Sequence, residues 1–271
     1  IASNSNGAAS ASRASSRSRT DEAYGVTAVL ALDLGNTSIK AALVEHGAVR
    51  EHVTIAHERW ESDGPSWWAR LDFKGAVGVA SVSPAATARV VAVLGRDRVR
   101  LAPVDFRAPI VNACDPPESV GQDRLFLAAA AFARTRSAVV AVSLGTAITV
   151  NHVDAGGVFR GGAIALGVGA ALRALERETG LLPLVDVTPG QPVPAVGRET
   201  HAAIRSGVVR GAAGLVDRLI ADIGAPGAPV IVTGGDAPLL VPFLATPVHV
   251  ELDLALLGIA LGLERALGGV S

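Results

Sequence analysis

Three short apolar runs, each ended by a turn, follow one another near the start of the sequence. They occupy 26–32, 39–44 and 48–55, and turns at Gly35 and Gly47 separate them. Apolar runs of this length between turn residues are typical of β-strands, and such short connections favour antiparallel neighbours. The pattern therefore predicts an antiparallel meander of three strands.

The same succession returns about 110 residues later, within 138–166. An apolar strand ends at a glycine turn, a second strand covers 148–153, and a third follows a turn at 154–157. The turns that hold equivalent positions in the two copies are Leu34-Gly35-Asn36-Thr37 and Leu144-Gly145-Thr146. So long a period excludes a solenoid and predicts two similar α/β halves, 26–135 and 136–271, with ligands bound in the crevice between them.

Helices are predicted after each meander. Ser83 and Pro84 are typical of a helix start and follow a strand at 76–82, whereas Gly180 is typical of a helix end. A polar connection, 61–66, is expected to lead into a short helix around Trp67 and Trp68. The other predicted elements are helices at 84–94, 124–134, 168–179, 200–223 and 253–267 and a strand at 229–233.

Composition and charge exclude several classes of protein. Lys and Arg number 24 against 25 Asp and Glu, a balance that gives no reason to expect nucleic acid or an anionic membrane as partner. One cysteine, Cys114, excludes a disulfide framework and a multi-cysteine zinc site. The longest uncharged stretch tested, 137–153, is interrupted by Gly145 and polar residues, whereas a membrane-spanning helix needs about 20 mostly apolar residues.

The first 25 residues differ from the rest of the chain. Residues 1–20 are rich in Ser, Ala and Arg, contain no acidic residue, and show no apolar periodicity. We predict a disordered leader, or a start placed too early, over 1–25; a targeting peptide is the alternative, because it would share this composition.

Two motifs in equivalent turns predict phosphate binding. In DLGNTSIK, 33–40, a strand delivers Asp33 to its end and Gly35 turns the backbone so that amides and hydroxyls face a ligand. Asp33 suits Mg²⁺ held through water, and Lys40 adds a cation, although its side chain could instead point to solvent. The turn SLGTAIT, 143–149, repeats the same chemistry; either turn alone would equally suit an ordinary hairpin.

Two further motifs are weaker on their own. TGGDAPLL, 233–240, would let the backbone approach a flat ligand closely, but a turn without function would look identical. GQDR, 121–124, places Asp123 and Arg124 where a loop enters a helix, which suits a hydroxyl substrate that carries its own carboxylate. Helix capping with a surface ion pair explains this spacing equally simply.

Together these motifs resemble those of type III pantothenate kinases. The resemblance extends from about residue 29 to the C-terminus and includes, besides the four motifs, FRGGAI at 159–164, LLP at 181–183 and GRETHAAIRSG at 197–207. It implies two duplicated ribonuclease-H-like, actin-like ATPase halves with mixed sheets around a nucleotide cleft. It also implies ATP-dependent phosphorylation of pantothenate to 4'-phosphopantothenate, the first step of coenzyme A biosynthesis, by a cytoplasmic homodimer that uses Mg²⁺ and a monovalent cation, K⁺ or NH₄⁺.

The resemblance also implies roles for individual residues. Asp123 is the expected proton acceptor, and Thr200 is expected to reach the pantothenate of the neighbouring subunit. The expected ATP-binding residues are Asp33, Leu34, Gly35, Asn36, Thr37, Ser38, Ile39, Lys40 and Thr146. The expected substrate-binding residues are Cys114, Gly121, Gln122, Asp123, Arg124 and Thr200.

Three positions depart from the family pattern. Cys114 stands where the family usually has a substrate-contacting tyrosine, and Ser143 stands where it often has an acid that binds the monovalent cation. Asn151 also replaces an acid. We therefore expect a weakened cation site at Ser143. The alternatives are a nucleotide-binding regulatory protein on the same scaffold with little kinase activity, and a kinase of another small hydroxy acid.

Overall fold

The computed structural model describes residues 28–35, 37–223 and 225–268, and the predicted leader and Asn36 lie outside these ranges. The described part contains two mixed sheets. The first has the order β3-β2-β1-β4-β5. Its meander is antiparallel, as predicted, and β4 and β5 extend it in parallel. The strands are β1 (Ala28–Leu34), β2 (Ser38–Glu45), β3 (Ala48–Ala56), β4 (Val77–Ser81) and β5 (Val99–Leu101).

The second sheet repeats this topology. Its order is β11-β10-β7-β8-β9-β6, so β7 to β11 correspond to β1 to β5, and β6 is an added strand beside β9. The internal duplication read from the sequence is therefore confirmed. The strands are β6 (Val111–Asn112), β7 (Val139–Leu144), β8 (Ala147–Val153), β9 (Val158–Leu166), β10 (Val230–Thr233) and β11 (His249–Val250).

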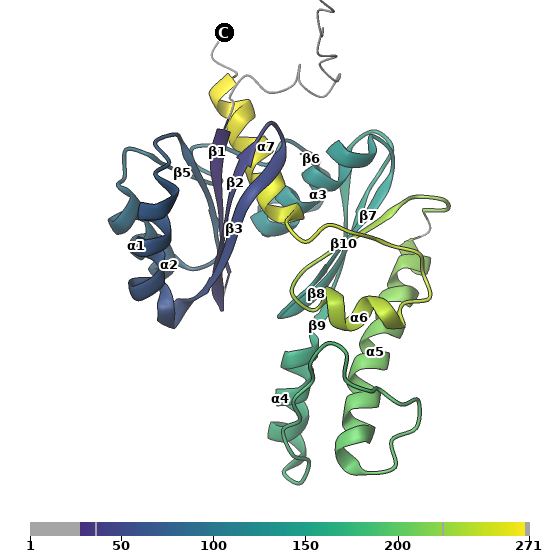
Figure 1. Ribbon diagram of the computed structural model, residues 1–271. Coiled ribbons are helices and arrows are strands. Elements are labelled where there is room, and N and C mark those ends of the chain that lie inside the picture. Colours follow the sequence, from purple (N-terminus) through teal and green to yellow (C-terminus); the bar gives the residue numbers. More distant parts are fainter. Residues whose placement is uncertain (1–27, 36, 224, 269–271) are drawn as a thin grey trace, which may run out of the picture.

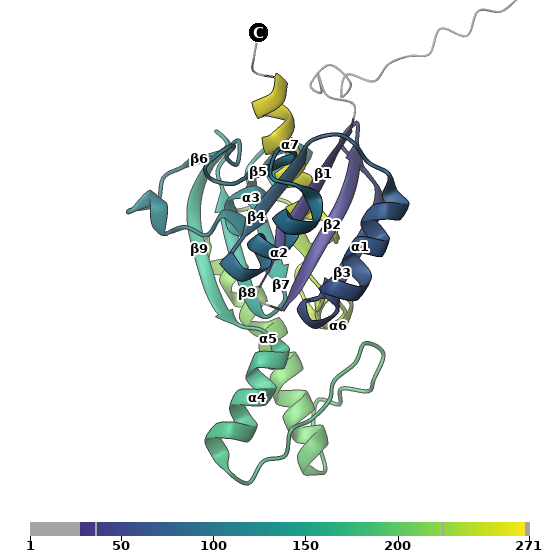
Figure 2. The ribbon, with the colours of Figure 1, turned by 90° about the vertical axis from the view of Figure 1, so that its left-hand side faces the viewer.

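The helices divide into three groups. α1 and α2 cover the outer side of the first sheet, α3 and α7 lie between the two sheets, and α5 packs on the outer side of the second sheet and extends beyond it with α4 (Figures 1 and 2). The short α6 follows β10. Their bounds are α1 (Trp60–Leu71), α2 (Pro84–Leu94), α3 (Gln122–Thr135), α4 (Val168–Thr179), α5 (Thr200–Ile223), α6 (Ala237–Leu240) and α7 (Leu254–Gly268). In the described part of the chain, the 3₁₀ turns are η2 (His57–Arg59), η3 (Pro117–Ser119) and η4 (Val241–Phe243).

Close contact between α3 and α7 joins the two sheets into one apolar core. Phe126 of α3 and Ile259 of α7 are buried in a cluster that also holds Val29 of the first sheet and Val139 of the second. Gly258 permits this approach, because a Cβ at that position would overlap the Phe126 carbonyl oxygen. The shared helix layer therefore fixes the sheets relative to each other.

One predicted connection is helical. The polar segment 61–66 belongs to α1, which starts at Trp60 and includes Pro65. Trp60 and Trp67 are buried on one face of α1, and the Trp60 ring packs so closely on Gly64 that a Cβ there would overlap it. Burial of two tryptophans stabilises the helix despite the weak helix propensity of this segment.

Among the described residues, no helix is long and apolar enough to cross a membrane.

Candidate active site

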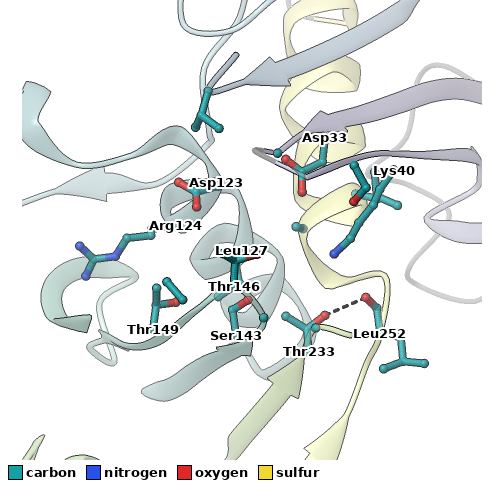
Figure 3. A pocket seen from close by; sticks show the side chains of 18 of the residues that line it. Asp33, Lys40, Asp123, Arg124, Leu127, Ser143, Thr146, Thr149, Thr233 and Leu252 are labelled. Carbon is teal, nitrogen blue, oxygen red and sulfur yellow. Dashed lines mark hydrogen bonds between the residues drawn. The ribbon is translucent and has the colours of Figure 1, made fainter. Parts of the chain in front are cut away.

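The two glycine turns meet in one cleft between the sheets. The cleft has a volume of about 260 Å³ and is lined from both halves of the chain. Figure 3 shows Asp33 and Lys40 on one wall and Ser143, Thr146 and Thr149 on another, with Asp123 between the two halves. The polar residues of the lining are Asp33, Gly35, Thr37, Ser38, Lys40, Asp123, Arg124, Ser143, Gly145, Thr146, Thr149, Thr233, Gly234 and Asp253.

A backbone hydrogen bond closes the first glycine turn, and His57 binds two of its carbonyl groups. The Gly35 amide donates to the Ser38 carbonyl at 3.1 Å, which closes the turn between β1 and β2. The His57 amide donates to the Thr37 carbonyl at 3.3 Å, and its ring Nε2 lies 2.9 Å from the Gly35 carbonyl oxygen. Arg89 Nη2 lies 3.3 Å from Nδ1 of the same ring. Because arginine only donates, Nδ1 accepts and Nε2 carries the proton that reaches Gly35.

The second turn is built the same way and supported by two neighbouring glycines. The Gly145 amide donates to the Ala147 carbonyl at 3.2 Å, and the Gly167 amide donates to Thr146 at 3.1 Å. A Cβ on Gly167 would overlap the Gly145 carbonyl, and one on Gly234 would overlap the Leu144 carbonyl. The TGGDA motif thus lies directly beside this turn, and Thr233 and Gly234 line the cleft.

Two carboxylates face the centre of the cleft. Burial raises the pKa of Asp33 from 3.8 to about 6; Lys40 lowers it, and Asp123 raises it further. Lys40 pairs with Asp33 across the β1–β2 ladder and lines the cleft, so its side chain does not point away from the site. Asp123 lies in the first turn of α3, as predicted, and its side chain is exposed to the cleft.

These residues fit a hydrated magnesium ion. A buried carboxylate whose charge is only partly offset gains from a nearby cation, and Mg²⁺ commonly takes one or two carboxylates plus water and substrate phosphates. Among the residues that the structure describes, no group of three His, Cys, Asp or Glu side chains forms a protein-only metal cage. The donor set therefore suits Mg²⁺ held with a phosphate ligand rather than a structural metal.

Arg124 lies on the opposite side of Asp123 from Asp33 and Lys40 (Figure 3). Its Nε donates to Asn151 Oδ1 at 2.7 Å, and its guanidinium lies over the Phe159 ring, with Cζ 5.5 Å from the centroid. Burial lowers the pKa of Arg124, whereas Asp123 and Cys114 raise it. Cys114, predicted to contact substrate, does not line the cleft, and its Sγ lies beside Gly161 of β9.

The remaining predicted residues fall into three positions. Leu34 and Ile39 have fully buried side chains, so they can offer a ligand only their backbone. Gly121 and Gln122 start α3 but do not line the cleft, and Thr200 starts α5 on a separate apolar groove beside α4.

Sequence reasoning missed His57 and Asp253. Neither belongs to a motif: His57 reaches the first turn from 22 residues away, and Asp253 enters the cleft just before α7. Asp253 also lies 3.6 Å from His52 Nδ1 on β3. Only the duplicated topology, which places the segment before α7 beside the cleft, could have suggested Asp253.

Solved structures with the same architecture include two dehydratase-associated proteins. The (R)-2-hydroxyglutaryl-CoA dehydratase component A of Acidaminococcus fermentans matches with a TM-score of 0.55 and 14% identity, over 89% of this chain and 100% of that one. The activator of the 2-hydroxyisocaproyl-CoA dehydratase of Clostridium difficile matches with a TM-score of 0.54 and 15% identity, over 89% and 96%. At this identity the likeness concerns the fold, and it confirms the predicted class.

Sequence comparison is more specific. A type III pantothenate kinase of Anaeromyxobacter dehalogenans (strain 2CP-C) is 33% identical over 253 residues, which cover 88% of this chain and 99% of the relative. One of Mycobacterium bovis (strain BCG / Pasteur 1173P2) is 32% identical over 264 residues, 88% and 96% of the two chains. The model of the type III pantothenate kinase family matches residues 29–222. The chain therefore belongs to the type III pantothenate kinase family of phosphotransferases.

Proposed function

We propose that this chain transfers the γ-phosphoryl group of ATP to pantothenate, giving 4'-phosphopantothenate and ADP as the first step of coenzyme A biosynthesis. The observation that carries the proposal is the convergence of both glycine turns and two carboxylates in one cleft. Phosphoryl transfer depends mainly on positioning and on neutralising charge, and this cleft offers amides, hydroxyls and a lysine for phosphates. Family membership supports pantothenate as the acceptor.

Each residue that lines the cleft has a proposed role that depends on its position there. Gly35, Thr37 and Thr146 bind phosphate oxygens through backbone and hydroxyl groups, and Asp33 holds Mg²⁺ through water. When bound, the ion neutralises charge on the phosphates. Asp123 orients the primary hydroxyl of pantothenate and accepts its proton as the oxygen bonds to the γ-phosphorus and the bond to ADP breaks. Arg124 binds the pantothenate carboxylate.

A monovalent cation, K⁺ or NH₄⁺, is part of the proposal. Ser143 lines the cleft and offers a hydroxyl without a formal charge. Asn151, the second neutral position, does not line the cleft, and its amide oxygen accepts from Arg124. The cation therefore binds beside Ser143 with less charge compensation than a carboxylate would give.

We further propose that the enzyme acts in the cytoplasm as a homodimer. Thr200 faces a groove between α4 and α5 rather than the cleft of its own chain. Ile164 and Leu166 on β9 and Leu181 after α4 are exposed beside it, at 63%, 61% and 94%. Apolar surface of this kind favours association, and a two-fold dimer would bring Thr200 to the partner's substrate.

A coupled ADP-release assay with pantothenate tests the activity. We expect ADP release that depends on pantothenate, on ATP and on Mg²⁺, with stoichiometric 4'-phosphopantothenate detected by mass spectrometry. A reaction without acceptor measures background hydrolysis. Release with a different hydroxy acid alone would identify another kinase, and nucleotide binding without release would indicate the regulatory alternative; either result contradicts the proposal.

A further inference from the structure

A fully buried amide side chain lies behind the substrate end of the cleft. Asn151 occupies the middle of β8, between Ala141 of β7 and Gly162 of β9, and none of its surface is exposed. Burial of a polar side chain among apolar strands costs stability unless its hydrogen bonds are made. Val153, two residues further along the same face of β8, is apolar and fully buried, so an apolar side chain would suit the packing at position 151.

Both ends of the Asn151 amide form hydrogen bonds, with the nitrogen as donor and the oxygen as acceptor. Nδ2 donates to the Ala141 carbonyl at 3.1 Å and to Thr149 Oγ1 at 3.0 Å. Oδ1 accepts from Arg124 Nε at 2.7 Å. Because Arg124 can only donate, the amide orientation is fixed: the oxygen must face the guanidinium and the nitrogen must face the strand.

This contact decides which part of the guanidinium remains for a ligand. An arginine can bind a carboxylate through Nε and one terminal nitrogen or through both terminal nitrogens. Asn151 occupies Nε, so the terminal edge is the one left. Nη2 on that edge is buried and has no hydrogen-bond partner among the described residues. Phe159 flanks the guanidinium and limits its rotation.

We propose that Asn151 is a positioning residue, which holds Arg124 so that its terminal edge receives the carboxylate of the acceptor substrate. The inference rests on the proposed function, because the acceptor is taken to be a hydroxy acid. A neutral amide suits this role: it fixes the direction of the guanidinium without forming an ion pair that competes with the substrate. Asn151 stands where the family has an acid, and its amide still offers Arg124 an oxygen acceptor.

Steady-state kinetics of Asn151→Leu, Asn151→Asp and wild type test the proposal. Asn151→Leu should raise the KM for pantothenate by roughly 10- to 100-fold, the effect of losing a hydrogen bond to a charged group, with the KM for ATP unchanged. Asn151→Asp keeps an oxygen for Nε but forms an ion pair with Arg124 and loses the donors to Ala141 and Thr149, so its KM for pantothenate should lie between those of wild type and Asn151→Leu. Val150→Ala, a buried change on the same strand that does not contact Arg124, should lower the melting temperature without moving either KM.

A double variant separates positioning from a structural role. If Asn151 acts through Arg124, adding Asn151→Leu to Arg124→Ala should not raise the pantothenate KM further. Independent, multiplying effects would overturn the proposal, as would an unchanged pantothenate KM in Asn151→Leu while wild type is active. Should the leucine variant not fold, Asn151→Ser is measured on the same criteria. Wild type that does not phosphorylate pantothenate would refute the proposed function itself, and the inference with it.

Discussion

Asp123 is the proposed proton acceptor, and the proposed chemistry depends on it most directly. It is the only acidic residue in the GQDR loop, and α3 presents it to the cleft between the phosphate turns and Arg124. Asp123→Asn should lower kcat by roughly 10²- to 10⁴-fold, the range for losing a general base, with ATP binding kept. Turnover and ATP titration measure both effects, and Glu118→Gln on the exposed turn before α3 is the control. Turnover near the wild-type rate would show that Asp123 is not the proton acceptor.

A second prediction at the residue scale concerns His57, which holds the first glycine turn. Its amide and ring bind the carbonyls of Thr37 and Gly35. His57→Ala should raise the KM for ATP by about fivefold, near the value of one hydrogen bond, with little change in the KM for pantothenate. Arg59→Ala is a matched control in the same 3₁₀ turn, since Arg59 pairs with Asp63 and does not contact the phosphate turn. An unchanged ATP KM in His57→Ala would contradict the prediction.

Ser143 carries the prediction for the monovalent cation. A hydroxyl provides an oxygen ligand but no charge, so wild type should need high K⁺ or NH₄⁺ for full activity. Ser143→Asp should lower the K⁺ concentration for half-activation by roughly tenfold, about the value of one added charge interaction. Activity is titrated with KCl against choline chloride at constant ionic strength. Tight activation of wild type at low K⁺, or no change in the variant, would count against it.

At the scale of elements, α7 carries a carboxyl group, that of Glu264, in a buried environment that disfavours its ionised form. Glu264 is 5% exposed, and neither oxygen has a hydrogen-bond partner among the described residues. Burial raises its pKa from 4.5 to about 7. The folded protein therefore holds this proton more tightly than the unfolded chain, and the free energy of unfolding falls as pH rises through about 4.5 to 7.

Glu264→Gln should remove that pH dependence. At pH 8 the variant should be more stable than wild type by about 1–3 kcal/mol, whereas at pH 4.5 the two should be similar. Denaturant unfolding at both pH values measures the difference, and Glu51→Gln at an exposed position of β3 is the control. A glutamine variant that is less stable than wild type at pH 8 would mean that the ionised carboxylate is stabilised in the fold.

Most elements could be predicted because their ends carry local signals. Ser83 accepts from the Ala86 amide and Gly180 adopts a left-handed conformation, so α2 and α4 begin and end where the sequence indicates. β5, β6 and β11 were missed because two or three residues show no periodicity. The two glycine turns are local and lie where the sequence predicts them, whereas the Arg124–Asn151 contact joins residues 27 apart and depends on how α3 packs on the second sheet.

At the scale of the molecule, the duplicated sheets and the shared α3–α7 layer bring the two glycine turns to one cleft. The second half carries two helices, α4 and α5, between β9 and β10, where the first half carries α1 between β3 and β4; part of α5 packs on the second sheet, and α4 extends beyond it (Figure 2). Their groove, about 810 Å³ and lined mainly by apolar side chains, contains Thr200 and Leu166. The residues that line this groove differ from those that line the cleft, and its apolar surface is the reason why we propose association through it.

Two variants on this groove separate assembly from substrate contact. Leu166→Glu places a charge on the exposed apolar surface and should convert the proposed dimer to monomer, because a carboxylate buried at an interface is strongly unfavourable. The monomer should also show a raised KM for pantothenate, since no partner supplies Thr200. Thr200→Ala should raise the same KM by about fivefold, near the value of one hydrogen bond, while the dimer persists. Analytical ultracentrifugation and kinetics on both variants decide the matter: a Leu166→Glu monomer with wild-type kinetics would show that the neighbouring subunit contributes nothing to the site.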